Sequence, residues 1–221
     1  MAKTPSPGIL EAAANGAPVQ EVERFALPEM QLRSITLDIV GTSPLITHRF
    51  SEKAKKKMRD KHAKRATTAK EVRNPMNEFE EATYFISRNP DRYGVSANAF
   101  YAAALDAALA LGAKKSEMRR SFSVRPDAFT GDGPMVEVHT PTPPVMREDT
   151  VTVGMGSSDL RYRPEFTEWS CRLRVVFDAR QVSAEQIANL FRQAGFSTGI
   201  GEWRQEKAGF YGAFDVRGIL S

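Results

Sequence analysis

Residues 168–178 constrain the fold more than any other part of the chain. Apolar side chains recur there at every second position, which is the spacing of a half-buried strand: Trp169, Cys171, Leu173, Val175 and Phe177. Arg172 and Arg174 fall between them, on the opposite face. A strand with one apolar and one polar face is typical of an antiparallel sheet that is covered by helices on one side.

Further strands and helices follow from similar patterns. Strands are predicted at residues 33–40, 121–125, 135–140 and 213–219. Helices are predicted at residues 97–111, where Ser96 is the cap and Gly112 the stop, and at 184–195, where Ser183 and Gln186 form a capping box and Gly195 ends the helix. These elements fit an α+β fold class: a ferredoxin-like (RRM-like) β-α-β-β-α-β core with helical and extended insertions, in which one sheet face stays free.

Two insertions and an arm complete the predicted organisation. Residues 1–30, rich in Ala, Pro and Gly, are predicted to be a flexible N-terminal arm. Residues 31–221 are predicted to form a single domain. It carries a basic helical insertion at about 42–92, with helices at 51–66 and 74–86, and an extended excursion at about 141–167.

Composition excludes several classes. The chain has 221 residues with a net charge of +4, which permits a polyanionic partner without requiring one. Cys171 is the single cysteine, so an internal disulfide and a cysteine-based zinc site are excluded. No apolar run approaches the roughly 18 residues of a membrane span, and no hydrophobic leader is present, so we expect a cytoplasmic protein without metal, cofactor or membrane partner.

Few residues suggest catalysis. Residues 154–158 lack the lysine of a phosphate-binding P-loop. Cys171 fits a small core residue better than a nucleophile, and His139 fits a surface histidine near a strand end. His48 is more informative because Arg49 adjoins it in a loop. It suits either acid–base cleavage of RNA or contact with a phosphate, and both interpretations remain open.

The basic helix suggests binding to phosphates. Residues 53–65 hold eight lysines and arginines, among which Asp60 is the single acid. Such a run predicts several phosphate contacts, although a solvated helix face is the alternative. The predicted contacts are Lys53, Lys56, Lys57 and Arg59, together with His48 and Arg49.

Two segments place aromatic residues beside cations. Arg161, Tyr162 and Arg163 suit stacking and phosphate pairing with a single strand, unless Tyr162 points inward and both arginines outward from a strand. Trp203, Arg204, Lys207 and Phe210 repeat the pattern in a glycine-rich loop, where glycines permit close backbone approach. The alternative for Trp203 is that it packs back on the core.

The layout resembles the RAMP superfamily, the repeat-associated proteins of CRISPR systems, and most of all its Cas7-like backbone subunits. The resemblance lies in the last predicted helix from Gln186 to Gly195, in the loop from Gly199 to Gly212, and in residues 93–100, which look like the family's entry to the first helix. It implies inserts that reach the next subunit and polymerisation along a strand. A short, stand-alone relative from a phage or mobile element fits equally well.

The functional hypothesis is therefore a non-catalytic protein that binds single-stranded RNA or DNA and self-assembles along it as a homo-oligomer. Two alternatives remain open: a RAMP-type RNA endonuclease that uses His48, and a structural assembly protein of a phage particle.

Overall fold

The computed structural model describes residues 29–64, 73–153 and 156–220, except the side chains of Ala54, Lys57 and Val153. Gln31–Ser221 form one compact unit with mixed α+β structure, which confirms the predicted class. The predicted arm at residues 1–30 falls almost wholly outside the described residues.

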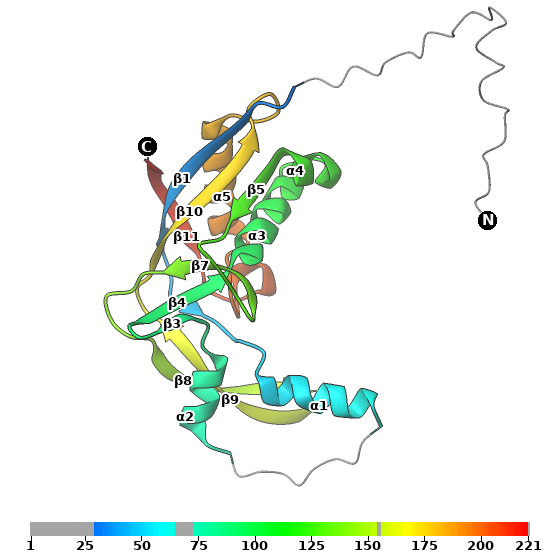
Figure 1. Ribbon diagram of the computed structural model, residues 1–221, viewed down its shortest axis with the longest axis vertical. Coiled ribbons are helices and arrows are strands. Elements are labelled where there is room, and N and C mark those ends of the chain that lie inside the picture. Colours follow the sequence, from blue (N-terminus) through cyan, green and yellow to red (C-terminus); the bar gives the residue numbers. More distant parts are fainter. Residues whose placement is uncertain (1–28, 65–72, 154–155, 221) are drawn as a thin grey trace, which may run out of the picture. The chain divides into compact units, whose positions relative to one another are not determined.

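A four-stranded antiparallel sheet organises this unit (Figure 1). Its strand order is β11-β1-β10-β5, with these bounds: β1 Leu32–Gly41, β5 Phe122–Arg125, β10 Ser170–Asp178 and β11 Phe214–Leu220. The alternation predicted for residues 168–178 is confirmed, because Cys171, Leu173 and Val175 are buried whereas Arg172 and Arg174 are exposed.

Two helices cover the apolar face of this sheet: α3 (Ala97–Ala110) and α5 (Ala184–Ser197) (Figure 1). Alanines of α3 and the apolar stripe of α5 join the sheet residues in one hydrophobic core. The capping box of α5 is present, since Gln186 N donates to Ser183 Oγ and Ser183 N donates to the Gln186 side chain. The short helix α4 (Lys115–Ser121) joins α3 to β5.

The predicted excursion is a long hairpin. Its strands β8 (Val145–Val153) and β9 (Ser157–Phe166) pair antiparallel throughout. The two-residue strand β2 (Leu45–Ile46) adds to β9 and completes a three-stranded sheet. The hairpin is therefore tied to residues that directly follow β1.

A third sheet has the order β3-β4-β7-β6. Its strands are β3 Phe85–Arg88, β4 Asp91–Ser96, β6 Ala128–Thr130 and β7 Gly133–Val138. An isolated bridge between His139 and Ser170 links the end of β7 to the start of β10. Because β4 leads directly into α3, this sheet fixes where the first covering helix begins.

Three helix predictions need correction. The predicted helix at 51–66 is α1 (Glu52–His62), and residues 65–66 lie outside the described residues. The predicted helix at 74–86 is only α2 (Pro75–Ala82), which ends where Thr83 Oγ1 donates to the carbonyl of Phe79. Thr83 is already extended, and Ile86 belongs to strand β3, in which Phe85 and Ser87 on either side of it pair with β4.

Gly195 does not end α5, which continues to Ser197. A Cβ atom at Gly195 would lie 1.9 Å from the carbonyl oxygen of Phe214. The glycine therefore allows helix α5 and strand β11 to pack closely, and the prediction of a helix stop there was wrong.

Candidate functional site

A cluster of buried and partly buried polar and aromatic side chains forms where β2, β8 and β9 meet the glycine-rich loop. Strand register places Arg147 of β8 opposite Arg163 of β9. A backbone hydrogen bond of 2.8 Å, donated by Glu202 N to the Ile46 carbonyl oxygen, holds the loop against β2. We call this set the Arg163 cluster; it comprises Thr47, His48, Arg147, Asp149, Arg163, Glu165, Glu202, Trp203 and Tyr211.

Arg163 lies at the centre of the cluster and is only 2% exposed. Its Nη1 atom is 3.5 Å from Asp149 Oδ2, and its Nη2 atom is 3.8 Å from Glu202 Oε2. Both separations exceed a good charge-assisted hydrogen bond, and Nε and Nη1 have no hydrogen-bond partner. Burial lowers the pKa of the Arg163 guanidinium, because the charged form loses its hydration.

Arg147 makes much shorter contacts with its polar partners than Arg163 does. Its Nε donates to Asp149 Oδ1 at 2.7 Å, and its Nη1 donates to Glu165 Oε2 at 2.7 Å and to Tyr211 Oη at 2.8 Å. Both guanidiniums also lie over the Trp203 ring, with Cζ 5.2 Å from its centroid for Arg147 and 5.3 Å for Arg163. Arg147 therefore ties the hairpin to the loop.

His48 borders the cluster as a half-buried imidazole. Burial lowers its pKa below 6.5, and the positive charge of Arg163 lowers it further, although Glu202 opposes this effect. The ring is therefore neutral at pH 7. Its Nδ1 atom is buried without a hydrogen-bond partner, as is Oγ1 of Thr47.

The glycine-rich loop is packed tightly against its own chain. A Cβ atom at Gly201 would lie 2.4 Å from the Ile46 carbonyl oxygen, and one at Gly209 would lie 1.7 Å from that of Trp203. The close backbone approach predicted for these glycines is thus made by the chain's own carbonyls. Trp203, at φ 49°, is partly buried and packs on Tyr211 with ring centroids 6.1 Å apart, although neither ring belongs to the hydrophobic core.

One of the two arrangements predicted for the Arg161–Arg163 segment does not occur. Arg161 and Tyr162 are half-buried, whereas Arg163 points inward, so the interpretation with both arginines outward was wrong. Partial burial and a hydrogen bond to Glu148 raise the pKa of Tyr162. A phosphate contact by Arg163 would require its guanidinium to leave the cluster, and we assign it to the cluster instead.

Several predicted phosphate contacts are engaged by acids of the chain. Arg49 Nε is 2.5 Å from Asp132 Oδ2, and Lys55 Nζ of α1 is 3.3 Å from the other carboxylate oxygen. Burial raises the pKa of Asp132, but Arg49 and Lys55 outweigh this effect and hold it below its usual value. Arg59 lies 4.0 Å from Glu52.

The remaining predicted residues are more exposed. Lys53 and Lys56 of α1 are exposed, and the side chain of Lys57 lies outside the described residues. In the loop, Arg204 and Lys207 both pair with Glu206, at 2.6 and 2.8 Å. Phe210 is 84% exposed.

Of the predicted site residues, the structure thus gathers His48, Arg163 and Trp203 in one cluster, whereas the cations of α1 make separate contacts. Sequence reasoning missed Arg147, Asp149 and Glu202. The pairing of β8 with β9 would have indicated Arg147, because it places Arg147 opposite Arg163.

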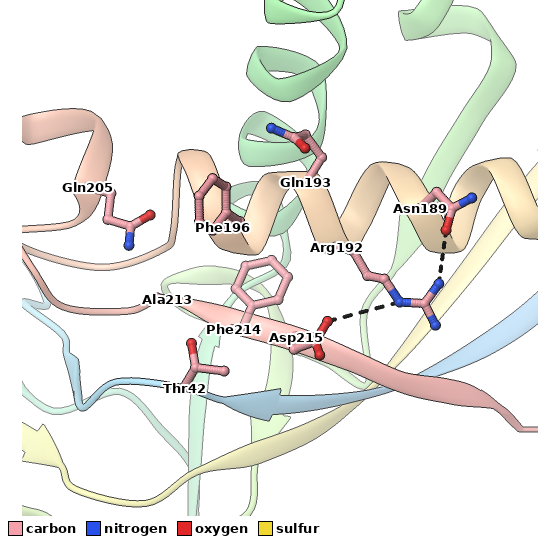
Figure 2. Close-up of a pocket in the computed structure, with 9 residues that line it drawn as sticks. All are labelled: Thr42, Asn189, Arg192, Gln193, Phe196, Gln205, Ala213, Phe214 and Asp215. Carbon is pink, nitrogen blue, oxygen red and sulfur yellow. Dashed lines mark hydrogen bonds and ion pairs between the residues drawn. The ribbon is translucent and has the colours of Figure 1, made fainter.

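A hollow of about 410 Å³ lies between α5 and β11. Figure 2 shows the side chains that line it. Arg192 crosses it, donating from Nη1 to Asn189 Oδ1 at 2.9 Å and lying 4.0 Å from Asp215. Phe196 lines the same hollow and is 74% exposed. None of the predicted site residues lines it.

Within residues 29–64, 73–153 and 156–220, no group of three or more His, Cys, Asp or Glu side chains is arranged to hold a metal ion. Over the same residues, every helix is too short or too polar to cross a lipid bilayer.

Comparison with known proteins adds no family. No protein-family model matches the chain, and no curated protein matches its sequence.

Proposed function

We propose that this protein binds single-stranded nucleic acid without cleaving it and self-assembles along the strand, in the manner of Cas7-like backbone subunits of the RAMP superfamily. The strand order β11-β1-β10-β5, with α3 and α5 on one face, supports a ferredoxin-like core for such a protein. Along the sequence, the inserts that carry the cations lie between the first strand of this core, β1, and its last strand, β11.

The observation that carries the proposal is the exposed basic surface of α1. Lys56 and Lys61 are exposed, and no carboxylate of the described residues lies within 4 Å of either ammonium group. Lysines that lack internal partners remain available to neutralise phosphates and release counterions. Phe210, 84% exposed, offers a ring on which a base can stack.

The test measures binding of a fluorescently labelled 20-nucleotide strand by anisotropy, starting at about 50 mM salt. Each phosphate contact contributes about 0.7 to the slope of log affinity against log salt for single strands. The double variant Lys56→Gln, Lys61→Gln should therefore reduce the slope by about 1.4. A matched control, Lys115→Gln with Arg120→Gln on α4, should leave it unchanged. Absence of binding by the wild-type protein at 50 mM salt would refute the proposal.

Electron microscopy tests self-assembly. Filaments that form only when the oligonucleotide is added support assembly along the strand. Filaments without it favour a structural assembly protein instead.

His48 favours a second candidate function, metal-independent cleavage of RNA. Burial and the nearby cations Arg163 and Arg161 lower the pKa of its imidazole and so favour the neutral form that a general base needs. Cleavage of a hairpin RNA by the wild-type protein that is lost in His48→Gln would establish this function. An intact RNA after prolonged incubation would exclude it.

A further inference from the structure

The face of the central sheet that no helix of the described residues covers, here called the uncovered face, carries a group of exposed arginines. Arg172 and Arg174 alternate with the buried residues of β10 and point away from α3 and α5. Arg125 lies on the same face of β5, because it pairs directly with Arg174. We call the exposed side chains of Arg125, Arg172, Arg174 and Arg217 the sheet-face arginines.

Arg217 joins them from β11. The register between β1 and β11 shifts there, so that Ile39 pairs with Val216 whereas Asp38 pairs with Gly218. Arg217 is exposed at this bulge and lines a hollow together with Val40 and Ser170, which belong to the uncovered face.

The pairing of Arg125 with Arg174 is electrostatically unfavourable by itself. Like charges directly opposite each other on neighbouring strands destabilise a sheet. No carboxylate of the described residues lies within 4 Å of any sheet-face arginine, and Arg174 Nη2 donates to the neutral carbonyl oxygen of Pro126 at 3.3 Å. A repulsive pair without an internal counter-ion suits a surface whose counter-ion comes from another molecule.

Acids on this face offset the positive charge only in part. Asp38 lies opposite Arg172 in the register of β1 and β10. Asp215, on the edge strand, is engaged by Arg192 of α5 at 4.0 Å. Four guanidiniums are therefore offset by two carboxylates that form no ion pair among the described residues: Asp38 on this face and Glu168 in the hollow beside Arg217.

The hollow beside Arg217 adjoins this face where β10 begins, at Ser170. It has a volume of about 480 Å³ and is lined by Arg217, His139, Val40 and Ser170, with Glu168 as its acid. Residues 41–43 also line it.

We infer that the sheet-face arginines bind the phosphate backbone of the single-stranded nucleic acid, as a second contact surface besides α1. This inference rests on the proposed function. Guanidinium groups bind phosphates through two parallel hydrogen bonds, which favours this partner over a neutral one. The strand positions around them hold Ser, Thr, Val and Asp residues, so the face fixes the backbone and leaves stacking of bases to other surfaces.

The test compares three proteins in the anisotropy assay with the labelled 20-nucleotide strand. The triple variant Arg125→Gln, Arg172→Gln, Arg174→Gln should reduce the salt slope by about 2, at about 0.7 per lost phosphate contact. The control Arg119→Gln, Arg120→Gln on α4 removes two exposed arginines elsewhere and should keep the wild-type slope. The variant Arg172→Lys, Arg174→Lys keeps the charge and should retain most of the slope.

The outcomes separate the two proposals. If the wild type binds and the α1 variant weakens binding while the triple variant retains the wild-type slope, the sheet-face inference is overturned and the proposed function stands. If the wild type does not bind, both are overturned. Should the triple variant fail to unfold cooperatively, Arg172→Gln alone decides, with an expected slope loss of about 0.7. Strong binding of the wild type to an acidic protein but not to the oligonucleotide would also overturn the inference.

Discussion

Replacing the two paired arginines of the hairpin by methionine should change stability by different amounts, although both side chains belong to the same cluster. Arg163→Met removes a buried cation whose Nε and Nη1 atoms have no hydrogen-bond partner. Each unsatisfied buried donor costs about 1–3 kcal/mol. The lost interactions are the Asp149 and Glu202 pairs at 3.5 and 3.8 Å and the contact with the Trp203 ring, which contributes about 2 kcal/mol when desolvated.

These gains and losses nearly cancel. A buried ion pair can often be replaced by apolar groups of similar volume without loss of stability, and Asp149 keeps its 2.7 Å bond to Arg147. We therefore expect the free energy of unfolding of Arg163→Met to lie within about 1 kcal/mol of the wild type.

Arg147→Met should cost more. It breaks three short hydrogen bonds and leaves Asp149, a buried carboxylate, with only the distant Arg163. Removing one partner of a buried pair costs about 3–5 kcal/mol, and because the Arg147 side chain is 29% exposed we expect the lower end, about 3 kcal/mol.

Equilibrium unfolding in urea, followed by tryptophan fluorescence and circular dichroism, measures the free energy of unfolding of each variant relative to the wild type. If the free energy of unfolding falls with urea concentration at the same slope in all three proteins, their unfolded states are comparable. If Arg163→Met loses as much stability as Arg147→Met, the assignment of Arg163 as a poorly satisfied cation is refuted.

Other perturbations test single contacts. Burial and Arg163 lower the pKa of His48, so the native state resists protonation of this ring and the free energy of unfolding should decrease as the pH falls through 6.5. The variant His48→Gln should flatten this part of the plot of unfolding free energy against pH. An unchanged plot would contradict the argument. Gly41→Ala would place Cβ 2.2 Å from Nε1 of Trp169, so a loss of about 3 kcal/mol is expected in urea unfolding, and a wild-type midpoint would show that the indole can move. Burial strongly raises the pKa of the Cys171 thiol, so it should react with a thiol reagent only as fast as the protein unfolds; rapid labelling of the native protein would refute its burial.

Much of the central sheet could be predicted from the sequence because its determinants are local. The alternation of residues 168–178 and the capping box at Ser183 each depend on neighbours within a few positions, and both are present. Residues 74–86 show the limit of such reasoning. Met76, Phe79 and Ile86 fit a helical stripe, yet Ile86 lies in a strand, because its neighbours Phe85 and Ser87 pair with β4, still downstream in the chain.

The Arg163 cluster could not be predicted, because burial of an arginine depends on distant partners. Asp149 comes from the other strand of the hairpin, and Trp203 comes from a loop beyond α5. Glycines were recognised as important, but their neighbours were not. Only the structure shows that Gly201 faces the carbonyl of Ile46, more than one hundred residues earlier in the chain.

The position of β1 inside the central sheet has a consequence for the timing of folding. Its register joins Leu32 to Asp178 on one side and Gly41 to Phe214 on the other. During synthesis, β1 therefore leaves the ribosome long before either neighbour exists, and its apolar residues need protection until then. Such long-range pairing is formed in milliseconds to seconds rather than microseconds. A chain that stops before residue 214 would leave one edge of β1 open to pairing with other chains.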